Sequence, residues 1–117
     1  MAVTATRSVT ITYSGDVIGT QIITAASNAA SAGSVEIKTL ASGANTITIP
    51  TGGTVPTAVT IVPPTGNTNS ITLKGVSGDT GITIHLTDPT TIALASSVTS
   101  FVLTAGAEIA GTRFFWS

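Results

Sequence analysis

The feature that most constrains the fold of this chain is a regular succession of short β-branched segments from residue 35 onward. The first β-branched residues of seven such segments lie 12, 12, 12, 11, 10 and 10 residues apart, at Val35, Ile47, Val59, Ile71, Ile82, Ile92 and Val102. Glycine, asparagine or proline stands between most of them, and these residues suit tight turns. Short strands at this spacing are typical of an antiparallel β-sandwich or barrel.

Composition and length agree with this pattern. Thr, Ile and Val make up 47 of the 117 residues, and all three are enriched in strands. The length suits one domain. We therefore predict that residues 1–117 form a single all-β domain, an antiparallel β-sandwich or jelly roll of about eight to ten short strands. Two of these strands are expected over 8–13 and 17–24 with a turn at 14–16, and residues 24–34 are expected to form a loop or a single helical turn.

Alternation of apolar and polar residues within each segment assigns a core face and an outer face. The outer face is rich in threonine and poor in charge, so that copies of the chain can approach one another without the repulsion of lysine-rich edges. Ile82 and Leu86 are expected on the core side together with Ile84. The other predicted core residues are Ile37, Ile49, Ile61, Leu73 and Leu103, and the predicted outward residues are Glu36, Lys38, Thr48, Thr72 and Lys74.

The last predicted strand differs because it carries aromatic residues on both faces. Phe114 and Trp116 fall on one side and Phe115 on the other, next to Arg113. A strand that is apolar on both sides must be covered on both sides. Either the domain covers it internally, or the segment forms a subunit contact. We predict that Arg113, Phe114, Phe115 and Trp116 lie in or next to an interface, where arginine and aromatic residues are enriched.

Charge and cysteine content exclude several classes of function. Charged residues make up 8% of the chain and the formal net charge is -1, so there is no basic field for nucleic acid or anionic lipid. No apolar run approaches the roughly 18 residues of a membrane helix. Arg7 is not followed by the apolar run of a signal peptide, which predicts synthesis in a cytoplasm. The lack of cysteine excludes thiolate nucleophiles and cysteine-based metal sites.

Low charge with a mean hydropathy of +0.52 predicts a surface that copies or other proteins cover.

The residues capable of catalysis are few and scattered. His85 is the one imidazole, no Gly-x-Ser-x-Gly motif accompanies it, and we interpret it as an exposed strand histidine before a turn at Asp88. The Ser-Gly-Asp segments at 14–16 and 77–79 lack the further acids of a calcium loop. No spacing pairs Glu36 with Glu108 as glycosidase carboxylates. We predict no catalytic residue, no cofactor and no metal.

Two other functions remain open at this stage. A carbohydrate-binding module for a host-surface glycan would stack sugars on exposed aromatic rings, for which Tyr13 and Trp116 are the candidates. A small hydrolase would require His85 to converge with a carboxylate and a serine in one cleft.

The middle and the end of the chain resemble a known class of protein. The similarity lies in VTIVPPTGNTNSITLKGVSGDTG at 59–81, TDPT at 87–90, SFVLTAGAEI at 100–109 and RFFWS at 113–117. Over residues 40–117 the chain resembles small virion structural proteins of tailed bacteriophages. The resemblance implies a non-enzymatic component of the tail, the tail tip or baseplate, or a decoration protein on the capsid. Its partners would be copies of itself and other virion proteins, held by multivalent assembly.

Overall fold

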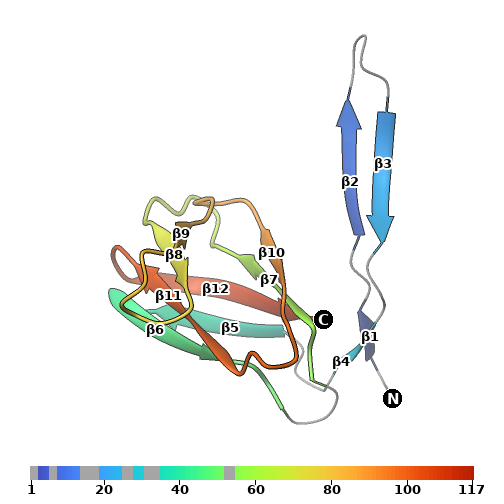
Figure 1. The fold of residues 1–117 in the computed structure, drawn as a ribbon. Helices are drawn as coiled ribbons and strands as arrows, with labels where there is room; N and C mark the ends of the chain where they lie inside the picture. The colour runs from blue at the N-terminus through green and yellow to red at the C-terminus, as the bar shows by residue number, and fades with distance from the viewer. Residues whose placement is uncertain (1–2, 6–7, 14–18, 25–27, 31–34, 52–54) are drawn as a thin grey trace.

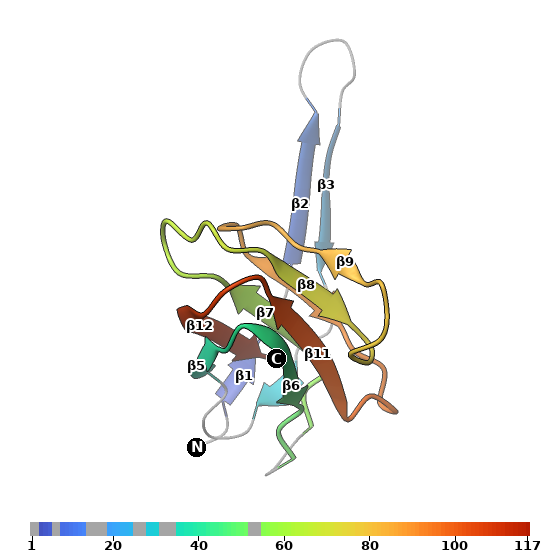
Figure 2. The same cartoon turned by 90° about the vertical axis from the view of Figure 1, so that its left-hand side faces the viewer.

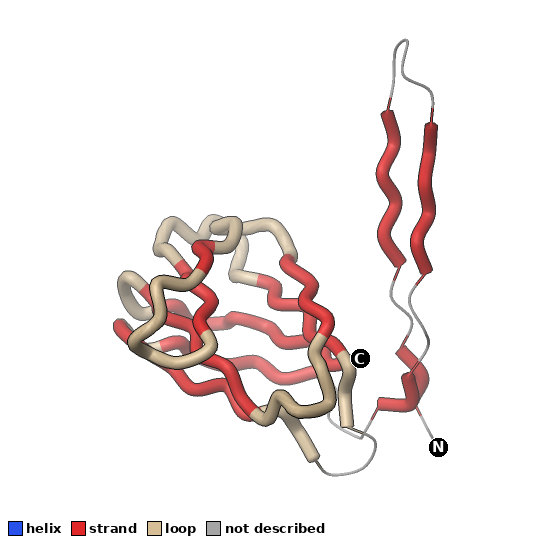
Figure 3. Tube along the Cα trace, viewed as in Figure 1, coloured by secondary structure: helices blue, strands red, loops and turns tan. Residues whose placement is uncertain are grey.

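The computed structural model of the chain describes residues 3–5, 8–13, 19–24, 28–30, 35–51 and 55–117, with side-chain environments over 35–51 and 55–117. Every regular element within these residues is a β-strand (Figure 3). Eight of the strands form two packed four-stranded sheets in which all neighbouring strands are antiparallel. The predicted all-β sandwich is therefore confirmed.

The two sheets appear as separate layers in Figures 1 and 2. The first sheet has the strand order β10-β7-β12-β5, formed by β5 (Val35–Leu40), β7 (Ala58–Val62), β10 (Thr90–Ala93) and β12 (Ile109–Trp116). The second has the order β6-β11-β8-β9, formed by β6 (Gly43–Thr48), β8 (Ile71–Lys74), β9 (Ile82–Thr83) and β11 (Ser100–Ala105). Each of the seven residues that marked the predicted strands lies in a different one of these elements.

The chain passes from the first sheet to the second at a tight corner between β5 and β6. Gly43 has a φ of 96°, a conformation that residues with a side chain rarely adopt. The Asn45 amide holds the corner: its Nδ2 donates to the carbonyls of Ala41 at 2.9 Å and of Leu103 at 3.1 Å, and its Oδ1 accepts from the Ala41 N–H at 2.9 Å. The two strands that this corner joins, β5 and β6, are edge strands of the first and the second sheet.

Four strands precede the sandwich and pair with one another in the described part of the chain. They are β1 (Val3–Ala5), β2 (Ser8–Tyr13), β3 (Gly19–Thr24) and β4 (Asn28–Ala30), paired β1 with β4 and β2 with β3. The β2–β3 hairpin extends away from the two sheets (Figures 1 and 2). The loop or helical turn expected over 24–34 was wrong for the part that holds β4, because backbone pairing with β1 makes this part a strand. The turn predicted at 14–16 lies outside the described residues.

The core lies between the sheets and contains most of the predicted residues. Ile49, Ile61, Ile84 and Leu103 are at most 8% exposed, which confirms their predicted burial. Leu73 is half-buried and packs against the same cluster. The remaining members of the buried cluster are Leu40, Ile47, Val59, Ile71, Phe101, Ala105, Ile109, Phe114 and Trp116.

The predicted facing of β5 was wrong. Ile37 is 71% exposed rather than buried, and Glu36 and Lys38 are half-buried rather than outward. The cause is the register with β12, in which Glu36 lies opposite Phe114. Directly opposed residues of two antiparallel strands share one face of the sheet, so the face that buries Phe114 also takes Glu36.

Two residues predicted on the core side are not buried. Ile82 is 70% exposed and Leu86 39% exposed; Ile82 lies opposite Leu73, but in a two-residue edge strand. Thr72 and Lys74 are half-buried but alternate with the inward Ile71 and Leu73 and so lie on the outer face, as predicted, and Thr48 is exposed as predicted.

Candidate functional site

The C-terminal strand β12 separates its aromatic residues between the core and the outer surface. Phe114 is 0% and Trp116 2% exposed, and their rings stack with centroids 6.2 Å apart. Trp116 also contacts Phe101 at a centroid distance of 6.4 Å. The domain's own core therefore covers Phe114 and Trp116, whereas Arg113 and Phe115 face outward.

The outward residues of β12 continue into an apolar patch on the edge strand β5. Phe115 lies opposite Val35, and Arg113 lies opposite Ile37. Phe115 is 37% exposed, Val35 48% and Ile37 71%. The Arg113 guanidinium carbon lies 5.8 Å from the centre of the Phe115 ring, within the range of a cation–π contact. We call Val35, Ile37, Arg113 and Phe115 the outer patch.

Sequence reasoning located only half of this patch. Arg113 and Phe115 were predicted as interface residues, and the structure brings them together on the outer face. Val35 and Ile37 were missed because their apolar character placed them in the predicted core. The opposite facing, with Glu36 and Lys38 inward, was not predicted because charged residues are rarely buried.

The inner face of β5 tolerates Glu36 because polar partners surround it. The Trp116 indole Nε1 donates to Glu36 Oε1 at 2.8 Å, and Lys38 Nζ lies 3.2 Å from Glu36 Oε2. The carboxylate thereby satisfies a buried indole N–H that would otherwise lack an acceptor.

This contact gives a stability prediction. Replacing Glu36 with alanine is expected to lower the free energy of unfolding by about 1–3 kcal/mol, because the buried Trp116 N–H loses its acceptor. Glu36→Gln, which keeps an oxygen in place, is expected to lose markedly less. Urea unfolding of both variants measures the difference. Equal losses would show that the Trp116 hydrogen bond contributes nothing.

An apolar cleft opens on the opposite side of the sandwich, between β8, β9 and the segment from β10 to β11. Its volume is about 490 Å³, within the usual range for ligand pockets. Sequence reasoning did not find it, because its lining residues come from segments distant in sequence. The side chains in its wall include Leu73, Ile82, Ile92, Leu94, Val98 and Phe101, with Lys74 and Asp79 as the charged members.

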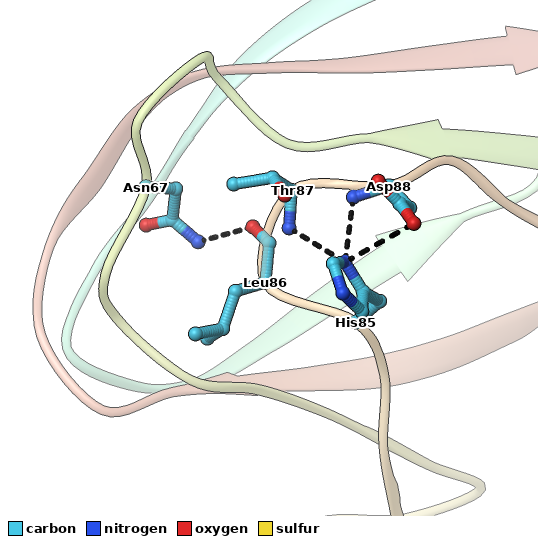
Figure 4. A network of polar contacts seen from close by, with 5 residues as sticks. All are labelled: Asn67, His85, Leu86, Thr87 and Asp88. Carbon is cyan, nitrogen blue, oxygen red and sulfur yellow. Dashed lines mark hydrogen bonds and ion pairs between the residues drawn. The ribbon is translucent and has the colours of Figure 1, made fainter.

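His85 serves as a turn cap (Figure 4). Its Nδ1 accepts hydrogen bonds from the backbone N–H of Asp88 at 2.8 Å and of Thr87 at 3.2 Å, which requires that this nitrogen carry no proton. The Asp88 carboxylate lies 3.7 Å from the same atom, beyond hydrogen-bonding distance. Asn67 Nδ2 donates to the Leu86 carbonyl at 2.8 Å and ties the turn to the preceding loop. His85 is therefore exposed and directly before a turn, as predicted, but it lies outside strand β9.

The acidic candidates do not converge in the described residues. Asp79 Oδ2 accepts from the Val76 N–H at 3.0 Å and closes the turn at 77–79. Within the same part of the chain no group of three or more His, Asp and Glu side chains lies close enough to hold a metal ion. The first Ser-Gly-Asp segment lies outside the described residues.

The aromatic candidates for sugar stacking are also limited. Trp116 is 2% exposed and stacked in the core, so it offers no face to a pyranose ring. Tyr13 lies in the hairpin strand β2, where side-chain environments are not described. In the described residues no helix has the length and apolarity to cross a membrane.

Comparisons with known proteins give no family, homologue or fold to assign. No family model, curated protein or solved structure matches this chain.

Proposed function

We propose that this chain is a non-enzymatic structural subunit of a tailed-bacteriophage particle, in the tail, the tail tip or baseplate, or as a capsid decoration protein. The observation that carries the proposal is the outer patch. Val35 and Ile37 of the edge strand β5 remain exposed beside Phe115 of the neighbouring strand β12, although β5 would bury its two apolar residues if its faces were exchanged. Adjacent exposed apolar residues of this kind mark contact surfaces.

The surroundings of the patch also suit an assembling surface. Across the first sheet the outward positions continue as Thr60 and Thr91, whose hydroxyl oxygens lie 2.8 Å apart. Arg113 is the one charged residue of the outer patch. Such a surface opposes the approach of a neighbour weakly, because few like charges meet and few charges lose water. Many copies on one particle would add modest contacts into a stable assembly. The resemblance of residues 40–117 to virion structural proteins agrees with this function.

The proposal predicts that the chain is a component of purified phage particles. Mass spectrometry of particles from the encoding phage is expected to detect it in multiple copies. Replacing Phe115 with alanine is expected to reduce its incorporation, because the patch loses its largest apolar side chain. Val76→Ala is the matched control, since Val76 is 62% exposed in a turn distant in sequence from the patch. Absence of the chain from particles would contradict the proposal.

A further inference from the structure

Strand β5 is a long open edge of the first sheet in the part of the chain that the structure describes. It ends the first sheet, with β12 as its neighbour on one side and no strand of the described residues on the other. Of the other three edge strands, β9 has two residues and β10 has four and follows Pro89, whereas β5 and β6 have six. Exposed edges are normally shortened, interrupted by proline or given charged side chains, including inward-pointing ones. β5 is neither short nor interrupted, and its charged residues are Glu36 and Lys38 on the inner face. The outward residues of β5 are Val35, Ile37 and Thr39.

The two long edges differ in what they present. The outward positions of β6 are Ala44, Thr46 and Thr48, which leave no large apolar group exposed. Those of β5 include Val35 and Ile37, which join Phe115 in the outer patch. Of the two long edges in the described residues, β5 therefore exposes the larger apolar surface.

The sequence of β5 is complementary to itself when two copies run antiparallel. If Ile37 lies opposite Ile37 of a second copy, Glu36 falls opposite Lys38 of that copy, and Lys38 opposite its Glu36. Opposite charges that face each other across strands are favourable, and like charges are unfavourable. Glu36 and Lys38 already lie on one face, 3.2 Å apart between Nζ and Oε2. The pairing would combine two such ion pairs into a two-by-two group in which every charge faces an opposite charge across the strands.

Other registers lose this complementarity. A two-fold axis at Glu36 would place two glutamates opposite each other, and one at Lys38 would place two lysines opposite each other. An axis between residues would pair Ile37 with a charged residue and exchange the two faces of the sheet between copies. The register with Ile37 opposite Ile37 therefore pairs opposite charges on the inner face and apolar residues on the outer face.

We propose that β5 is a contact between two copies of this chain, paired antiparallel about a two-fold axis at Ile37, so that the two first sheets join into one continuous sheet. In this arrangement the two Ile37 side chains lie next to each other, and the outer patches of both copies become one surface. The inference deepens the proposed function, and it rests on that function in treating the chain as an assembling subunit.

The lack of cysteine in the natural chain allows a direct test of the register. In the Ile37→Cys variant the two introduced thiols would lie on directly opposed residues, about 4.5–5.5 Å apart at Cα, within the range of a disulfide. Mild oxidation of the purified full chain followed by non-reducing electrophoresis is expected to convert most of it to a covalent dimer. Ile82→Cys is the matched control, because Ile82 is 70% exposed at another sheet edge, and this variant is expected to stay monomeric.

A second cysteine position on the same strand checks the axis. The two copies of Thr39 would lie four positions apart, about 13 Å at the rise of an extended strand, so Thr39→Cys alone is not expected to crosslink. A mixture of Thr39→Cys with Val35→Cys is expected to form the mixed disulfide dimer. Crosslinking of Thr39→Cys as readily as Ile37→Cys would overturn the register, and the absence of any Ile37→Cys dimer would overturn the contact.

The native chain supplies an independent measurement. Sedimentation equilibrium is expected to show a dimer, and Ile37→Lys is expected to be monomeric at the same concentration. In dilute solution, where the natural chain is dissociated as well, the two melting temperatures are expected to agree, because residue 37 is exposed. A natural chain that is monomeric in this assay but present in particles would overturn the β5 contact and leave the proposed function standing. A dimer that crosslinks through residue 37 but is absent from particles would do the reverse.

Discussion

Replacing Phe114 with alanine is expected to lower the free energy of unfolding by about 3–5 kcal/mol, the usual loss for a buried aromatic residue. Phe114 is 0% exposed, and its ring stacks on Trp116 with an angle of 16° between the planes. The truncation removes this contact and leaves a cavity between the two sheets. Urea unfolding followed by fluorescence measures the loss directly, because Trp116 is the single tryptophan of the chain.

The adjacent residue provides the matched control. Phe115→Ala removes the same atoms from the outer side of the same strand, and it is expected to cost about 1 kcal/mol or less in the isolated chain. Its effect should appear instead in particle incorporation. Equal stability losses at 114 and 115 would mean that the facing of β12 is not as described.

The positions of the strands in the sandwich were predictable because they depend on local signals. Turn residues and β-branched segments occur in the sequence itself, and each residue used to mark a segment lies in a strand of its own. Alternation identified Ile61 and Leu103 within the strands, and Ile49 directly after β6, as core residues, and all three are buried.

The choice of face on β5 could not be predicted because it depends on a distant strand. Alternation shows that Val35 and Ile37 share one face and Glu36 and Lys38 the other, but it does not say which face is inside. That choice follows from the register with β12, which contains a shift between Ile109 and Thr112. A shift of one residue in such a register exchanges the two faces completely.

The N-terminal region shows the same limit. Residues 28–30 are Asn-Ala-Ala, which carry no β-branched signal, yet they form β4 because Ala29 pairs with Thr4. A strand defined by a partner more than twenty positions away leaves little trace in its own composition.

The candidate site was predictable in part for a related reason. Aromatic residues on both faces of a strand indicate that its outer side must be covered. On this ground Arg113 and Phe115 were predicted to lie in or next to a contact. The same argument failed to separate them from Phe114 and Trp116, which the domain covers itself. The apolar cleft could not be predicted from the sequence, because residues from β8 to β11 form its wall and only the packing of the two sheets brings them together.

A comparison of two isoleucines tests the facing of β5 most directly. Ile61→Ala is expected to lower the free energy of unfolding by about 2–5 kcal/mol, because Ile61 is 0% exposed and the truncation leaves a cavity in the cluster between the sheets. Ile37→Ala removes the same atoms from a side chain that is 71% exposed, and it is expected to change stability by about 0.5 kcal/mol or less.

The protein concentration decides what the Ile37 measurement reports. In dilute solution, where association is weak, Ile37→Ala is expected to unfold at nearly the same urea concentration as the natural chain. At high concentration the natural chain gains stability from any contact that forms only in the folded state, and Ile37→Ala should lose part of that gain. A large loss for Ile37→Ala at every concentration would place Ile37 in the core and return β5 to the facing that its alternation first predicted. A loss that grows with concentration would instead show that the apolar face of β5 is buried by association rather than by folding.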